Sequence, residues 1–162
     1  MSIIHRKAFL TLGLLGSAGF VFKNKATAQQ QKPPPLDKEL VKEFVGKCHG
    51  DLARTKELLT QQPALLNACW DWGGGDFETG LEGAGHMGNR EIAQYLLDNG
   101  ARMNIFCAAM LGKMDVVKAL LTAYPNLKSS KGPHGLQLLH HAKRGGEQAK
   151  EMLDYLQSIG AS

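Results

Sequence analysis

One spacing recurs along this chain of 162 residues: a glycine, then a pair of large apolar residues eight positions later. The copies with this spacing are Gly50 with Leu58-Leu59, Gly88 with Leu96-Leu97, and Gly112 with Leu120-Leu121. In a fourth copy, Gly146 precedes Tyr155-Leu156 by about one residue more. The glycine is typical of a turn between two helices, and neither helix could bury its apolar side alone. The spacing therefore predicts an all-α fold in which about four helix–turn–helix units stack on one another.

The units are not evenly spaced. Successive turn glycines lie 38, 24 and 34 residues apart. The first interval is long because residues 67–79 insert a loop rich in glycine and aromatic residues. The second is short because residues 102–104 leave almost no room for a hairpin between units two and three.

Short phrases in the chain resemble the ankyrin repeat, whose pattern runs Thr-Pro-Leu-His-x-Ala, helix, glycine turn, helix with paired leucines, then Gly-Ala. The phrases are Thr79-Gly80-Leu81, Leu139-His140-His141-Ala142, Gly100-Ala101 and Gly160-Ala161. The resemblance implies an ankyrin-repeat solenoid over residues 37–162, with repeats at about 37–68, 77–101, 102–127 and 132–162. Apolar stripes under polar faces in the first and last helices indicate a capped array. The resemblance also implies that partners bind at the finger tips and on the concave face.

Residues 1–28 have the layout of a signal peptide. Arg6-Lys7 is followed by an uncharged run over residues 8–22 and then by Ala26-Thr27-Ala28, a small-x-small cleavage pattern. Arg6-Lys7-Ala8-Phe9-Leu10 resembles a twin-arginine signal in which lysine replaces the second arginine, so the twin-arginine and general secretory routes both stay open. An uncleaved anchor is the alternative to cleavage after Ala28. Residues 29–36, rich in Gln and Pro, are expected to be a linker. The mature protein is expected in the periplasm or outside the cell, without a membrane segment.

The net charge of +4 comes from this N-terminal segment. Four of the 19 Lys and Arg residues lie in residues 1–28, which contain no Asp or Glu, so the other 15 are balanced by 15 acidic residues. Nucleic-acid binding normally requires a surplus of basic residues. The chain is therefore not expected to bind nucleic acid.

The inserted loop is the strongest candidate for a binding site. It carries both tryptophans of the chain among three carboxylates: Trp70, Asp71, Trp72, Asp76, Phe77 and Glu78. Exposed tryptophans are frequent in the energetic centre of protein interfaces. The alternative is that they fold back over the first repeat while Gly73, Gly74 and Gly75 permit the turn.

The histidines suggest a second kind of site. Glu82 and His86 are four residues apart on one expected helix face, where they could line a polar groove or form a surface pair. His134, His140 and His141 fall within eight residues, but His140 and His141 point in different directions on a helix, which disfavours a shared metal. His134 is expected to contact a partner beside Phe106 and His86.

These features predict a monomeric, exported module that binds a protein partner and is not an enzyme. No cofactor and no metal are expected. The alternative is a small enzyme or ligand-binding protein that uses the Asp76–His86 region with His134. Of the three cysteines, Cys48 and Cys107 are expected to be buried in helices, and an odd number leaves at least one without an intramolecular disulfide.

Overall fold

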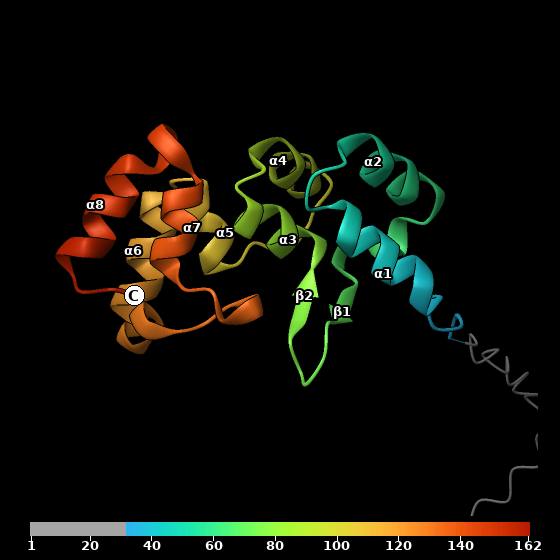
Figure 1. The fold of residues 1–162 in the computed structure, drawn as a ribbon, viewed down its shortest axis with the longest axis horizontal. Coiled ribbons are helices and arrows are strands. Elements are labelled where there is room, and N and C mark those ends of the chain that lie inside the picture. Colours follow the sequence, from blue (N-terminus) through green and yellow to red (C-terminus); the bar gives the residue numbers. More distant parts are fainter. Residues whose placement is uncertain (1–31) are drawn as a thin grey trace, which may run out of the picture. The chain divides into compact units, whose positions relative to one another are not determined.

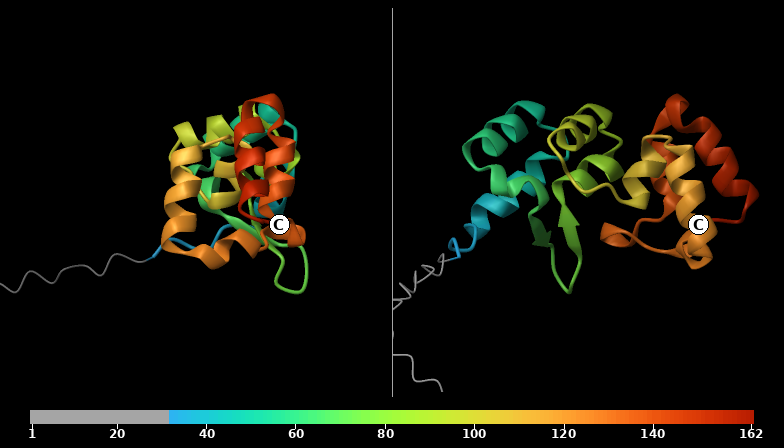
Figure 2. Two further views of the ribbon diagram at one scale, coloured as in Figure 1. Left: turned by 90° about the vertical axis from the view of Figure 1, so that its left-hand side faces the viewer. Right: turned by 180° about the vertical axis from the view of Figure 1, so that it is seen from behind.

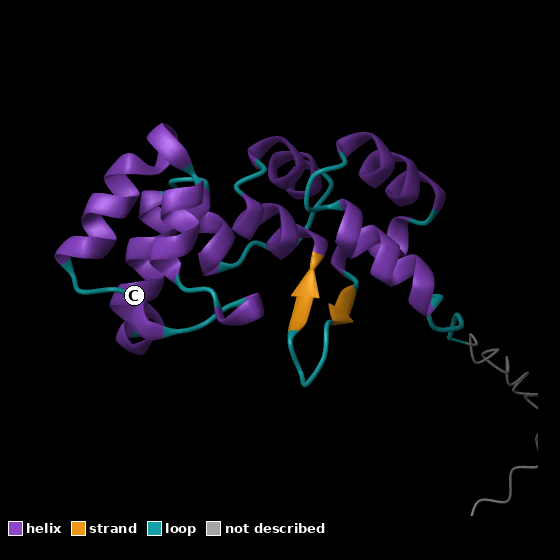
Figure 3. Ribbon diagram, in the orientation of Figure 1, coloured by secondary structure: helices purple, strands orange, loops and turns teal. Residues whose placement is uncertain are grey.

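The computed structural model describes residues 32–162, so the segment predicted as a signal peptide lies outside the described residues. This part of the chain contains eight α-helices and one two-stranded hairpin (Figures 1 and 3). The helices are α1 (Lys38–Lys47), α2 (Leu52–Gln61), α3 (Gly80–Met87), α4 (Arg90–Asp98), α5 (Ile105–Met110), α6 (Met114–Ala123), α7 (Leu138–Arg144) and α8 (Lys150–Ser158). The prediction of a mainly helical chain is confirmed.

Consecutive helices form four pairs, each joined by a short turn. Asp37, Asp51, Thr79, Asn89 and Asn104 cap the starts of α1 to α5, and each side chain accepts a hydrogen bond from a backbone N–H of the first helical turn. Such caps satisfy N–H groups that have no partner within the helix. Local sequence therefore sets where these five helices begin.

The turn glycines have two different roles. Gly88 and Gly112 have φ values of +75° and +71°, a conformation that favours glycine over residues with a side chain. A Cβ atom on Gly112 would also lie 2.6 Å from the carbonyl oxygen of Gln148 in the fourth pair. These glycines thus reverse the chain and allow neighbouring pairs to approach closely.

Two apolar cores run through the stacked pairs. The first lies mainly among α1 to α4 and the second among α5 to α8. Helix α5 belongs to both, because it gives Cys107 and Met110 to the first core and Ala108 and Ala109 to the second. Its six residues thereby join the two halves.

The third pair does not separate its neighbours completely. Helix α3 packs against α7 as well as against α5. The Arg90 guanidinium donates to the carbonyl oxygens of Met110, Leu111 and Gly145, and so links pairs two, three and four. The short interval between Gly88 and Gly112 and the short helix α5 allow this contact. It brings the fourth pair within reach of the second.

The inserted loop contains strands, which the sequence did not predict. Strands β1 (Cys69–Asp71) and β2 (Phe77–Thr79) pair antiparallel, with Trp70 opposite Glu78. Gly73, Gly74 and Gly75 all have positive φ in the connecting turn. The hairpin projects beside α1 and α3, on the side away from α2 and α4 (Figures 1 and 2). The 3-10 turn η3 (Pro133–Gly135) lies on that same side.

Cys48 and Cys107 are buried and Cys69 is exposed, and all three are free thiols. Burial raises the pKa of Cys48 and of Cys107 to about 12, so neither is a reactive thiolate. The expected burial of these two residues is confirmed. Within residues 32–162, every helix is too short or too polar to cross a bilayer.

Candidate metal centre

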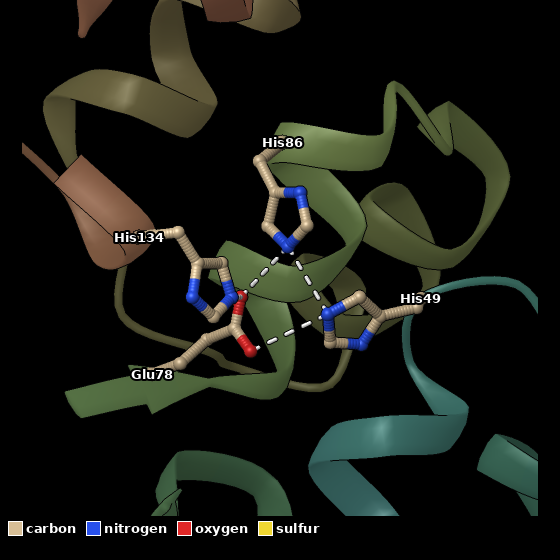
Figure 4. A group of neighbouring side chains, drawn as sticks. All are labelled: His49, Glu78, His86 and His134. Carbon is tan, nitrogen blue, oxygen red and sulfur yellow. Dashed lines mark hydrogen bonds and ion pairs between the residues drawn. The ribbon is translucent and has the colours of Figure 1, made fainter. Parts of the chain in front are cut away.

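Four side chains from distant parts of the chain point toward one another between the hairpin and η3: His49, Glu78, His86 and His134 (Figure 4). One nitrogen or oxygen atom from each lies within 4.8 Å of the corresponding atom of every other. His49 follows α1, Glu78 lies in β2, His86 in the last turn of α3, and His134 in η3. Three helix pairs and the hairpin therefore contribute to one cluster.

Glu78 is the buried carboxylate of the cluster, with a side-chain exposure of 0%. Side chains alternate along a strand, so Glu78 points inward while its neighbour Phe77 points outward. The indole N–H of Trp72 donates to Oε2 of Glu78 at 2.6 Å. Burial alone would raise the pKa of Glu78, but His86, Trp72 and His49 outweigh it and hold the pKa below its ordinary value. The carboxylate is therefore ionised at neutral pH.

The second oxygen of this carboxylate, Oε1, is buried and accepts no hydrogen bond. Nε2 of His86 is 2.9 Å from it and Nε2 of His134 is 3.4 Å from it. The hydrogen bond of the His86 ring is formed instead with Nε2 of His49, which lies 3.0 Å from Nε2 of His86. A buried, charged oxygen without a donor is unfavourable unless a further positive group is present. Oε1 thus faces the Nε2 atoms of His86 and His134 with its lone pairs unused, while Nε2 of His49 lies 3.4 Å from Oε2.

The His49 ring is oriented by backbone. Its Nδ1 lies 3.0 Å from the carbonyl oxygen of Val45, and since a carbonyl can only accept, Nδ1 carries the proton. In the neutral ring, Nε2 then has a free lone pair that faces the cluster. Space for the ring comes from Gly83 in α3, where a Cβ atom would lie 2.9 Å from Cε1 of His49.

His134 is oriented by Asp76. Its backbone N–H donates to one carboxylate oxygen at 2.7 Å, and its Nδ1 donates to the other, also at 2.7 Å. These bonds lower the pKa of Asp76, the backbone N–H contributing most. In the neutral ring, Nε2 of His134 then has a free lone pair, and it faces Glu78. A carboxylate that accepts from one ring nitrogen while the other faces a shared centre is typical of metal-binding histidines.

His86 is the most central of the three histidines and the least exposed, at 11%. Because Nε2 of the neutral His49 ring carries no proton, Nε2 of His86 is the donor in the bond between these two rings. From the fourth helix pair, the Nε2 of His140 donates to the backbone carbonyl oxygen of His86 at 3.0 Å. This bond ties the end of α3 to α7 beside the cluster.

The residues expected to bind a partner divide into two groups. Asp76, Glu78, His86 and His134 come together in the cluster, and Trp72 lies over it, with its ring 6.2 Å from that of His49 and 6.3 Å from that of His134.

The other residues of the insertion lie outside the cluster. Trp70 packs against the first core under Lys42, while Phe77 is 60% exposed on the outer face. Asp71 accepts backbone N–H bonds within the hairpin turn.

The structure gives Glu82, Phe106 and His141 roles that differ from those expected from the sequence. Glu82 does not pair with His86, because its carboxylate bonds to the backbone N–H and hydroxyl of Thr79 as part of a capping box. Phe106 packs on the second core, supports Gly132 and lies against the ring of His141. Burial lowers the pKa of His141 to about 4, so this histidine is a neutral core residue whose Nδ1 donates to the Gln137 carbonyl.

The sequence did not single out His49. It stands directly before a turn glycine, where the second and third copies have Met87 and Leu111, so its local pattern is that of a helix end. The only available signal was that one histidine stood near the turn of the first unit. Its proximity to His86 follows from the packing of α1 on α3.

Comparisons with protein-family models, with curated proteins and with solved structures give no match for this chain.

Proposed function

We propose that this protein binds a divalent transition-metal ion, with Zn²⁺ as the reference ion, through His49, Glu78, His86 and His134. The observation that carries the proposal is the buried, unpartnered Oε1 of Glu78, which faces the Nε2 atoms of His86 and His134, with Nε2 of His49 in the same cluster. A cation at this point would accept lone pairs from all four groups. It would also balance the buried negative charge of Glu78.

The distances between the donor atoms suit a small tetrahedral site. Zinc binds imidazole nitrogen and carboxylate oxygen at about 2.0–2.2 Å, which places neighbouring ligand atoms about 3.4 Å apart in a tetrahedron. Among the donor atoms, Oε1 of Glu78 lies 2.9 Å from Nε2 of His86 and 3.4 Å from Nε2 of His134, and the Nε2 atoms of His86 and His49 are 3.0 Å apart. Binding would require the proton of the neutral His86 ring to move from Nε2 to Nδ1, because the metal takes the lone pair of Nε2.

The ligand types narrow the class of metal. Imidazole ligands favour zinc, copper, iron and nickel, whereas calcium and magnesium prefer sets made mainly of oxygen atoms. The set contains no thiolate, so a cluster of iron and sulfur is disfavoured. We therefore place the site in the group of first-row divalent ions.

We also propose that the helix pairs form an ankyrin-type solenoid. Support comes from the four helix–turn–helix pairs, from the left-handed glycines at three of the turns, and from a hairpin between α2 and α3 where an ankyrin array would carry a finger. The direct packing of α3 on α7 departs from a regular array, in which each unit contacts only its neighbours. That departure is what brings His134 to His86.

The test is a calorimetric titration of the full chain, without a polyhistidine tag, after removal of metal by a chelator. We expect one Zn²⁺ per chain. A chain in which Lys131 is replaced by glutamine is the control, since Lys131 is exposed close to His134 in sequence. Heat of dilution alone, or binding without a fixed stoichiometry, would contradict the proposal.

Gly83→Ala tests the position of the His49 ring without changing any of the four candidate ligands. The new methyl group would meet the ring of His49 at 2.9 Å and move it, so zinc affinity is expected to fall by about tenfold or more. Gly85→Ala is the matched control on the same helix, because its Cβ would meet Cys107 at an ordinary 3.6 Å. Equal zinc affinity in the two variants, measured by competition with a chromophoric chelator, would show that His49 is not a ligand.

A second candidate function is the exported protein-binding module expected from the sequence. It is favoured by the outer face of the hairpin, where Phe77 is 60% exposed, and by Trp72, which is 39% exposed. Cross-linking from a photoreactive residue at position 77 in the native cells tests it, with the exposed position of Asp115 as control. A cross-linked partner specific to position 77 is expected, and equal products from both positions would contradict this function.

A further inference from the structure

Residues 130–137, which we call the strap, carry the one ligand candidate that comes from the C-terminal half of the described chain. The strap carries η3 and His134, whereas the other three ligand candidates lie between residues 49 and 86. The ring of His134 is 5.1 Å from that of His86, centre to centre, and its Nε2 is 3.4 Å from Oε1 of Glu78. His134 is thus the single group that would join the C-terminal half to a bound metal.

Without a metal, the hydrogen bonds from the strap to the hairpin are between partly exposed groups. His134 bonds twice to Asp76, and the two side chains are 33% and 31% exposed. Bonds between exposed charged and polar groups contribute little, because water competes for both partners. At the base of the strap, Pro133 is buried and Gly132 lies against the Phe106 ring of the third pair.

The backbone of His134 is also strained. Its φ and ψ are 57° and 18°, and it is the only residue other than glycine with positive φ in residues 32–162. Left-handed backbone is unfavourable for a residue with a side chain and persists where surrounding interactions enforce it. Here the interactions that could enforce it are the Asp76 bonds and, on metal binding, a bond from Nε2.

We infer that metal occupancy decides whether the strap is docked on the β1–β2 hairpin, so that the surface formed by Trp72, Asp76 and His134 is stable only in the metal-bound protein. This inference rests on the proposed metal-binding function. A metal held jointly by His134 and by the ligands of the first two pairs must release His134 before the strap can leave. Metal binding then opposes opening by mass action, while the stacked helices remain folded in both states.

Amide hydrogen exchange followed by NMR tests this inference in the full chain. The reporter is the backbone N–H of His134, which bonds to Asp76 across the strap–hairpin contact. If opening requires metal release, free zinc at a hundredfold over its Kd slows this exchange by about a hundredfold. We expect at least about a tenfold slowing at this amide. The amides of α2, remote from the strap in the stack, serve as the internal reference and respond only through global unfolding.

Two variants make the result specific. In His134→Gln, the amides of the strap should no longer respond to zinc, because the strap carries no other ligand. In Lys131→Gln, an exposed change on the same strap, the zinc response should be the same as in the unchanged protein. Loss of the response in both variants would contradict the role of His134.

The two proposals fail in different ways. If calorimetry shows one bound zinc but the His134 amide exchanges at the same rate with and without it, the strap is docked independently of metal and the inference is wrong. If no zinc binds, the metal-binding function itself is wrong. Tight zinc binding with a slowed His134 amide supports both.

Discussion

Replacement of His86 by glutamine is expected to lower zinc affinity by at least about a hundredfold. Replacing a residue that only orients a metal ligand typically lowers metal affinity by about 10- to 100-fold. Loss of a central ligand should lower it further. His86 is central because its Nε2 lies 2.9 Å from Glu78 and 3.0 Å from His49. Competition with a chelator of known affinity measures the change.

His140→Gln is the matched control for His86→Gln. His140 is the histidine nearest in role, since its Nε2 donates to the backbone carbonyl of His86 without facing the cluster. A glutamine amide can donate the same bond, so zinc affinity should stay within about threefold, well below the effect of losing a ligand. If His140→Gln weakened binding as much as His86→Gln, the metal would have to lie nearer to α7 than we propose.

Gly145→Ala is expected to lower the free energy of unfolding by about 3 kcal/mol, at the upper end of the range for overpacked sites. Gly145 follows α7, and a Cβ atom there would overlap the carbonyl oxygen of Met110 and crowd Ala149. Backbone cannot turn aside as a side chain can, so pairs three and four would have to separate. The backbone of Gly145 has an ordinary right-handed conformation, so the gain from replacing glycine, up to about 1 kcal/mol, is too small to compensate.

The neighbouring change Gly146→Ala separates steric overlap from backbone preference. Gly146 has φ of +62° but open space around its Cα atom. Its replacement should therefore cost only about 1–2 kcal/mol, the penalty for an L-residue in left-handed backbone. Urea unfolding of the two variants gives the comparison, and a larger loss for Gly146→Ala than for Gly145→Ala would refute the steric argument.

This pair of glycines illustrates how far sequence reasoning extends. The spacing to Tyr155-Leu156 correctly singled out Gly146 as the turn residue, because backbone preference is a local property. The more demanding position is Gly145, whose constraint is the carbonyl of Met110, a residue in another helix pair. A local sequence pattern carries no information about the distance to a residue in another helix pair.

The candidate site divides in the same way. The aromatic and acidic insertion indicated Trp72, Asp76 and Glu78, and the positions of the histidines indicated His86 and His134. What the sequence could not supply was the buried side of Glu78, which depends on strand alternation in a hairpin read as a loop. It also gave Glu82 the wrong role, because a helix cap and a surface pair use the same residue types at nearly the same spacing.

By itself, the sequence determined the helix pairs, the turns between them and most helix starts, since caps, glycines and apolar spacing act over a few residues. The irregular intervals between the turn glycines were also readable, but their consequence was not. Only the tertiary structure placed α3 against α7 and carried His134 to His49, 85 positions earlier in the chain. The physical reason is that the relative position of two distant helices depends on how every helix between them packs. A short third unit therefore changes which distant side chains meet without changing any local sequence pattern.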